Sequence, residues 1–139
     1  MSKPGPIILI EDDEDDLEII DEIIKKLGIP NELKFFTDGK QALEFLRTTT
    51  VQPFLILSDV NMPLMGGFEL RKIINDDEEL RSKSVPFVFL TTSADPAAIR
   101  EAYKMNVQGF FVKGSNLDGI SRIMKMLYEY WQECRHPNN

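Results

Sequence analysis

The chain has 139 residues, of which 42% are hydrophobic and 28% charged, and its formal net charge is −7. This composition predicts a single globular domain, since disordered chains are poorer in hydrophobic residues. Nucleic acids and anionic membranes are bound through basic surfaces, so the acidic balance argues against both as partners. The single cysteine, Cys134, cannot form an internal disulfide, and no apolar stretch is long enough for a signal peptide or a membrane span. We therefore expect a cytoplasmic protein.

Five short apolar runs recur along the chain and predict five β-strands. They are Pro6–Ile10, Leu33–Phe36, Phe54–Leu57, Pro86–Leu90 and Gly109–Val112. Four of them are nearly uninterrupted, which is typical of strands in a parallel sheet that helices cover on both faces. The run that contains Lys34 is expected at an edge of the sheet.

A segment with helical character follows each run. Four of these segments are defined by apolar residues at helical spacing, namely Leu17, Ile20, Ile23, Ile24 and Leu27; Ala42, Leu43 and Leu46; Phe68, Leu70, Ile73 and Ile74; and Ile120, Ile123, Met124, Leu127 and Trp131. The helix after the fourth run begins at Asp95-Pro96, an N-cap followed by proline at the first helical position, and continues through Tyr103. The alternation of strand and helix predicts a (βα)5 doubly wound α/β domain.

Two further local patterns concern the ends of these helices. Ser115-x-x-Asp118 has the spacing of a capping box and is expected to open the last helix. Asn75–Ser84 is predicted to be a long polar loop, for which solvation is favoured over a role in binding.

Six consecutive carboxylates, Glu11 to Asp16, follow the first predicted strand. Asp13–Asp16 fall in the first turn of the next helix, where the helix dipole stabilises negative charge. Glu11 and Asp12 instead occupy the carboxyl end of a buried strand, the edge at which open α/β sheets bind ligands. A calcium-binding EF-hand loop beginning at Asp12 is excluded, because Leu17 and Ile23 stand where it needs glycine and glutamate.

Polar residues follow the other buried strands as well: Asp59 after the third, Thr91 after the fourth and Lys113 after the fifth. If the first and third strands are neighbours, Asp59 converges with Glu11 and Asp12. Carboxylates that close repel one another and favour a bound cation, and oxygen ligands with open positions suit Mg2+. A lysine and a hydroxyl at the same edge are the groups that would bind the remaining oxygens of a phosphoryl group.

In this combination the chain resembles the receiver domain of two-component response regulators. The resemblance is carried by the acidic pair, by Asp59-x-x-Met62-Pro63 with Gly66-Gly67 after it, by Thr91 and by Lys113, and it runs from about Pro6 to Trp131. It implies a flavodoxin-like fold with a five-stranded parallel sheet in the order 2-1-3-4-5. It also implies one receiver domain over residues 1–139, with its core at about 6–134 and no output domain.

The resemblance further implies a phosphoacceptor site at Asp59. Asp12, Asp59 and the backbone carbonyl of Asn61 would bind Mg2+ directly, and Glu11 would act through a water. The proteins expected to supply the phosphoryl group are a sensor histidine kinase or a histidine phosphotransfer protein.

Three further residues have implied roles. Lys113 would pair with Asp59 at rest and with a phosphoryl oxygen after transfer, while Thr91 would hydrogen-bond another phosphoryl oxygen. Phe110 occupies the position of the family's aromatic switch residue. Gly114 stands where the family usually has a proline after a cis peptide, and since a non-proline cis bond costs about 2.5–4 kcal/mol we expect a trans peptide here.

Signalling is expected through protein contacts at the surface formed by the helix after the fourth strand, the fifth strand and the last helix; a homodimer is a further expected assembly. The competing interpretation is a receiver-like binding module that works without phosphorylation.

Beyond self-catalysed phosphotransfer and dephosphorylation we expect no enzyme activity. A haloacid-dehalogenase-type phosphatase would need Asp-x-Asp where the chain has Asp59-x-Asn61, and there is no P-loop or dinucleotide-binding motif.

Overall fold

The computed structural model describes residues 4–92, 95–114 and 116–135. Strands and helices alternate along this part of the chain, apart from two consecutive helices before the fourth strand. The elements are β1 Ile7–Ile10, α1 Glu14–Lys26, β2 Leu33–Phe36, α2 Gly39–Thr48, β3 Leu55–Ser58, α3 Gly67–Asp76, α4 Glu78–Lys83, β4 Phe87–Thr91, α5 Pro96–Lys104, β5 Gly109–Val112 and α6 Leu117–Glu133.

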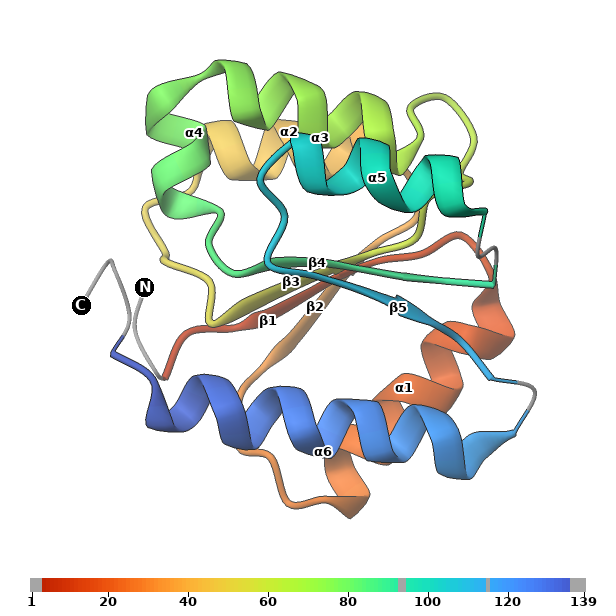
Figure 1. The fold of residues 1–139 in the computed structure, drawn as a ribbon. Coiled ribbons are helices and arrows are strands. Elements are labelled where there is room, and N and C mark those ends of the chain that lie inside the picture. Colours follow the sequence, from red (N-terminus) through yellow and green to blue (C-terminus); the bar gives the residue numbers. More distant parts are fainter. Residues whose placement is uncertain (1–3, 93–94, 115, 136–139) are drawn as a thin grey trace.

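The strands form one parallel sheet in the order β2-β1-β3-β4-β5. Helices α1 and α6 cover one face of the sheet, and α2, α3, α4 and α5 cover the other (Figure 1). The predicted doubly wound fold and strand order are therefore confirmed, and β2 lies at an edge as expected. Because β1 and β3 are neighbours, with Ile10 opposite Ser58, the residues that follow them emerge side by side.

Two hydrophobic cores lie on opposite faces of the sheet. In β1, Ile7 and Leu9 pack with α1 and α6, whereas Ile8 and Ile10 pack with the helices of the other face. All four side chains are at most 2% exposed. Burial on both faces explains why this strand is an unbroken aliphatic run in the sequence.

Local capping sets where the helices begin. Asp13 caps α1 by accepting hydrogen bonds from the backbone N–H groups of Asp15 and Asp16, at 2.9 and 3.2 Å. Asp95 caps α5, with Pro96 at its first position, as predicted. The predicted capping box of α6 is wrong: Ser115 lies outside the described residues, and Asn116 is the N-cap, accepting from the backbone N–H of Gly119.

The prediction of a polar loop over Asn75–Ser84 is also wrong, because α3 continues to Asp76 and Glu78–Lys83 forms α4. Asp77 caps this short helix through the backbone N–H of Leu80, whose side chain is buried. The Lys83 ammonium donates to the carbonyls of Leu46 and Thr49 at the end of α2. A helix with one buried apolar side chain produces no hydrophobic periodicity, so the pattern did not reveal it.

A buried arginine joins α3 to the turn after α5. The Arg71 Nε donates to the carbonyl of Met105 at 2.8 Å, and its Nη2 donates to that of Asn106 at 3.0 Å. Its guanidinium lies 5.0 Å from the ring centre of Phe87 in β4. Burial, with a smaller effect of Arg81, lowers the pKa of Arg71 to about 10, so it stays charged at neutral pH.

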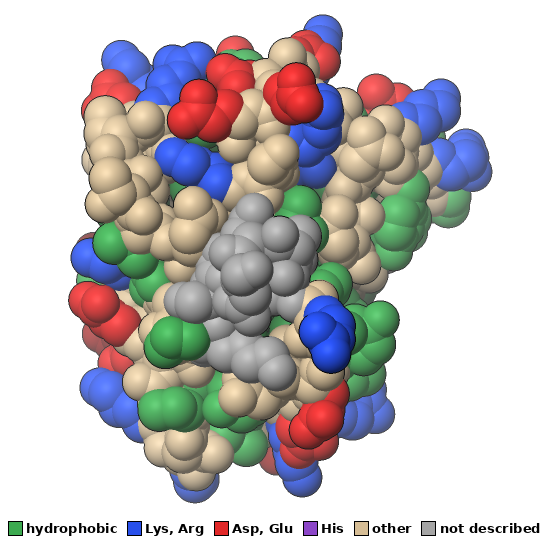
Figure 2. All heavy atoms as spheres, turned by 90° about the vertical axis from the view of Figure 1, so that its left-hand side faces the viewer, with side chains coloured by type: hydrophobic (Ala, Val, Ile, Leu, Met, Phe, Trp, Pro, Cys, Tyr) green, Lys and Arg blue, Asp and Glu red, His purple; other side chains and the backbone are tan. Residues whose placement is uncertain are grey.

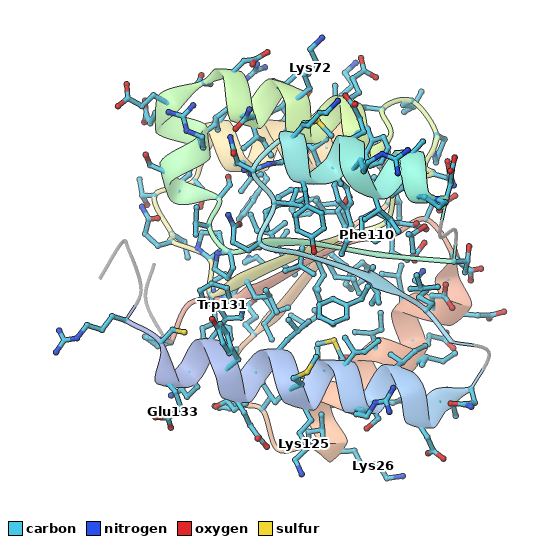
Figure 3. The ribbon with its side chains drawn as sticks, in the orientation of Figure 1. Lys26, Lys72, Phe110, Lys125, Trp131 and Glu133 are labelled. Carbon is cyan, nitrogen blue, oxygen red and sulfur yellow. The ribbon has the colours of Figure 1, made fainter. Side chains whose placement is uncertain are left out.

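The amino ends of the strands lie together at one end of the molecule (Figure 1). Trp131 on α6 lies toward the amino ends of the strands (Figure 3). Figure 2 faces that end, and the side chains that it colours place acidic and basic groups together around the rim, without an extended basic patch. Among the described residues, no helix is both long and apolar enough to span a membrane.

Candidate functional site

Three carboxylates meet at the carboxyl ends of β1 and β3. Glu11 and Asp12 follow β1, Asp59 follows β3, and each offers an oxygen such that all three lie within 4.8 Å of one another. The convergence expected from the strand order is therefore present in the structure. Asn61, whose backbone carbonyl was predicted as a further ligand, lies two residues beyond Asp59 in the loop and is exposed.

The three carboxylates differ in their exposure to solvent. Glu11 is 1% exposed, the Asp59 side chain is 13% exposed, and Asp12 is exposed. Burial raises the pKa of Glu11 to about 7; the hydrogen bond from Lys113 opposes the rise, and the charge of Asp59 adds to it. Asp12 and Asp59 are thus accessible to a cation, while Glu11 is buried.

Lys113, directly after β5, is the cation at the centre of this group, and 4% of its side chain is exposed. Its Nζ donates a hydrogen bond to Glu11 Oε1 and lies 3.7 Å from Asp59 Oδ2. Burial alone would lower the pKa of Lys113. The hydrogen bonds to Glu11 and Asp16, with the charges of Glu11 and Asp59, outweigh burial and raise that pKa above its ordinary value.

Asp16 also belongs to the site. From the sequence it was predicted only to interact favourably with the helix dipole. Its Oδ2 accepts a hydrogen bond from the Lys113 Nζ at 2.9 Å, closer than the approach of Asp59. Its side chain is 24% exposed, whereas Glu14 and Asp15 in the same turn are exposed. The signal in the sequence was the spacing of Asp16, which lies one helical turn after Asp12. Because Glu14, Asp15 and Asp16 are consecutive carboxylates, the sequence did not show which of them would reach the site.

The turn after β3 holds Asp59 through its backbone. The Asp59 N–H donates to the carbonyl of Ile10 at 2.9 Å, and the Asp59 Oδ1 accepts from the backbone N–H of Val60 at 2.7 Å. Gly67 opens α3 directly against this turn: a Cβ on it would lie 2.1 Å from the carbonyl oxygen of Asp59. The second glycine of the Gly66-Gly67 pair is required by this close approach of two backbones.

Thr91 and Phe110 lie beside the charged group on the last two strands. Thr91 ends β4 and is buried, and its carbonyl accepts from the Lys113 N–H at 2.7 Å. Phe110 in β5 is half-buried on the α5 side of the sheet (Figure 3), with its ring centre 5.9 Å from that of Phe89. Among the described residues the one cis peptide bond precedes Pro86, so the bond before Gly114 is trans, as expected.

The five parallel strands define a doubly wound α/β domain. Its carboxyl edge presents three clustered carboxylates, a buried lysine and a strand-end threonine. The family model of the response regulator receiver domain matches residues 7–125. The chain belongs to this family, whose members act in two-component signalling and interact with histidine kinases and downstream proteins.

Similar proteins include the response regulator Rcp1 of Synechocystis sp., which is 30% identical over 135 residues, covering 94% of this chain and 90% of Rcp1. The crystal structure of the phosphorylated cyanobacterial phytochrome response regulator RcpA is 30% identical, with a TM-score of 0.84, and the match covers 93% of this chain and 94% of RcpA. The crystal structure of the Mn2+-bound form of Rcp1 is 29% identical in sequence and also has a TM-score of 0.84. The match covers 95% of this chain and 97% of the Rcp1 chain.

Proposed function

We propose that this protein is a phosphoacceptor response regulator that takes a phosphoryl group on Asp59. The observation that carries the proposal is the position of the Asp59 carboxylate: it is partly exposed, shares a cluster with Glu11 and Asp12, and lies 3.7 Å from the Lys113 ammonium. This arrangement combines a nucleophile with the charges that phosphoryl transfer requires.

In the transfer step an oxygen of Asp59 attacks the phosphorus of a phosphohistidine. A P–O bond forms to the carboxylate while the P–N bond breaks, and its electron pair leaves with the imidazole nitrogen. The product is an acyl phosphate on Asp59 and a free histidine. A small phosphodonor such as acetyl phosphate would react in the same way: its P–O bond to the acetyl group breaks, and acetate is the leaving group.

The donor set fits Mg2+, because all candidate ligands are oxygens and Asp12 and Asp59 are accessible from solvent. Asp12, Asp59 and the backbone carbonyl of Asn61 would bind it directly, and the buried Glu11 through a water. Bound there, the cation would offset negative charge on the transferring group. The existence of a Mn2+-bound form of the similar protein Rcp1 supports the binding of a divalent cation by this chain.

Lys113 and Thr91 complete the proposed site. Lys113 would donate to one phosphoryl oxygen and Thr91 to another, so both contacts would arise only after transfer. The phosphoryl source is a sensor histidine kinase or a histidine phosphotransfer protein. A downstream protein would bind the surface of α5, β5 and α6, and the chain would also form a homodimer. The whole process would take place in the cytoplasm.

Mass spectrometry after incubation with acetyl phosphate and Mg2+ tests the proposal. The wild-type protein should gain one base-labile phosphoryl group, and Asp59→Asn should gain none because an amide is not a nucleophile. Asp118→Asn, which removes an exposed carboxylate from the first turn of α6, is the matched control and should label normally. Labelling that persists in Asp59→Asn would refute the assignment, and an unlabelled wild-type protein would favour the phosphorylation-independent binding module.

A further inference from the structure

Three carboxylates, those of Glu11, Asp16 and Asp59, lie close to the Lys113 ammonium. Its Nζ makes two hydrogen bonds, one to Glu11 and one of 2.9 Å to Asp16, while Asp59 Oδ2 is 3.7 Å away. The last distance is longer than a hydrogen bond. An ammonium has three N–H groups, and two of them donate to Glu11 and Asp16 instead of to the proposed phosphoacceptor.

Asp16 reaches Lys113 because of how α1 begins. The N-cap role belongs to Asp13, which accepts from the backbone N–H groups of Asp15 and Asp16. The Asp16 carboxylate is therefore not needed for capping, and the capped turn directs it toward the end of β5. Asp15, one residue earlier, is exposed, although it carries the same charge in the same turn.

Asp16 also lies next to open space. It lines a cavity of about 540 Å3 together with Ile19, Gly114, Asn116, Leu117, Asp118 and Ile120. Its side chain can therefore move away from Lys113 without displacing the packed core. The contact between Asp16 and Lys113 has the properties of an exchangeable ion pair: it is direct, partly shielded from water and not locked in place by packing.

We propose that Asp16 is a positioning residue that holds Lys113 back from Asp59 and competes with the phosphoryl group for the lysine. The proposal rests on the proposed function, because it assumes that a phosphoryl oxygen on Asp59 is the other partner of Lys113. In the resting protein this restraint leaves the Asp59 oxygens accessible to the cation and the phosphodonor. After transfer, Lys113 has to exchange Asp16 for the phosphoryl oxygen, so Asp16 lowers the affinity of the site for a phosphoryl-like anion.

The test is the affinity for beryllofluoride, a phosphoryl mimic, in saturating Mg2+, measured by calorimetry. Asp16→Asn should bind it about three- to tenfold more tightly than the wild type, as expected for loss of a partly buried ion pair. Asp15→Asn loses the same charge in the same turn and is the matched control; it should bind within about twofold of the wild type. Asp16→Glu restores the charge and should return the affinity toward the wild-type value.

A second measurement needs no phosphoryl mimic. The NMR signals of the Lys113 ammonium in the ligand-free protein should shift in Asp16→Asn and stay in place in Asp15→Asn. Equal effects of the two asparagine variants, or weaker beryllofluoride binding by Asp16→Asn, would overturn the role of Asp16. If the wild-type protein binds no beryllofluoride at all, the proposed function fails. If the wild type binds it but Asp16→Asn behaves like Asp15→Asn, only the role of Asp16 fails.

Discussion

Folding changes the protonation of Glu11. Its pKa is raised from 4.5 to about 7, chiefly by burial. Below pH 4.5 the carboxyl is protonated in both the folded and the unfolded chain. Between pH 4.5 and about 7 the unfolded chain loses the proton first, so Glu11 makes the free energy of unfolding fall as the pH rises.

This behaviour predicts that Glu11→Gln flattens the dependence of stability on pH. A shift of one pKa unit corresponds to about 1.4 kcal/mol, so the wild-type protein without Mg2+ should lose on the order of 1–3 kcal/mol across this window relative to the variant. Lys113 does not contribute to this pH dependence, because its pKa is raised and it therefore stays protonated across the window. Urea unfolding from pH 4.5 to 7.5 provides the measurement. Parallel curves for the two proteins would show that Glu11 is not the titrating group.

At the level of secondary-structure elements, the junction between β3 and α3 is tightly packed at Gly67. A Cβ at Gly67 would lie 2.1 Å from the Asp59 carbonyl oxygen and 2.8 Å from Phe89 Cε1. Both neighbours belong to the packed interior, so neither can move without shifting a strand or the start of α3.

Gly67→Ala should therefore lower the free energy of unfolding by about 1–3 kcal/mol and slow phosphorylation of Asp59. Gly114→Ala is the matched control, because a Cβ there has its nearest neighbour 4.0 Å away, at the backbone nitrogen of Asn116. Its stability should stay within about 0.5 kcal/mol of the wild type. Chemical denaturation of both variants measures the difference, and an equal loss at the two glycines would contradict the proposed close packing.

On the scale of the whole molecule, a chain of contacts joins the site to the surface of α5, β5 and α6. Gly67 packs on Asp59 and faces Phe89, whose ring lies 5.9 Å from that of Phe110. Our hypothesis is that phosphorylation draws the Thr91 hydroxyl toward the phosphoryl group and that Phe110 then turns inward. A ligand shifts such an equilibrium only through contacts that differ between the two states, here the bonds from Thr91 and Lys113 to phosphoryl oxygens.

Thr91→Ala should accordingly leave phosphorylation of Asp59 largely intact and uncouple it from this surface. NMR shift mapping with beryllofluoride and Mg2+ measures the coupling: in the wild type, signals around Tyr103, Phe110 and Ile120 should move, and in Thr91→Ala they should move far less. Wild-type signals that stay still at these residues while the Asp59 loop responds would show that the protein does not signal through this surface.

Periodicity, capping and burial leave local patterns in the sequence, and these patterns predicted the strands, the polar residues at the strand ends and five of the six helices in the described part of the chain. The tertiary structure was needed to show that Asp16 also contacts Lys113. Asp15 and Asp16 are identical in type and adjacent, yet only Asp16 binds a lysine 97 residues further along the chain. Helix α4 likewise depends on Leu80 and Lys83 docking on distant residues. Such contacts form only when packing brings remote segments together, and no local pattern records them.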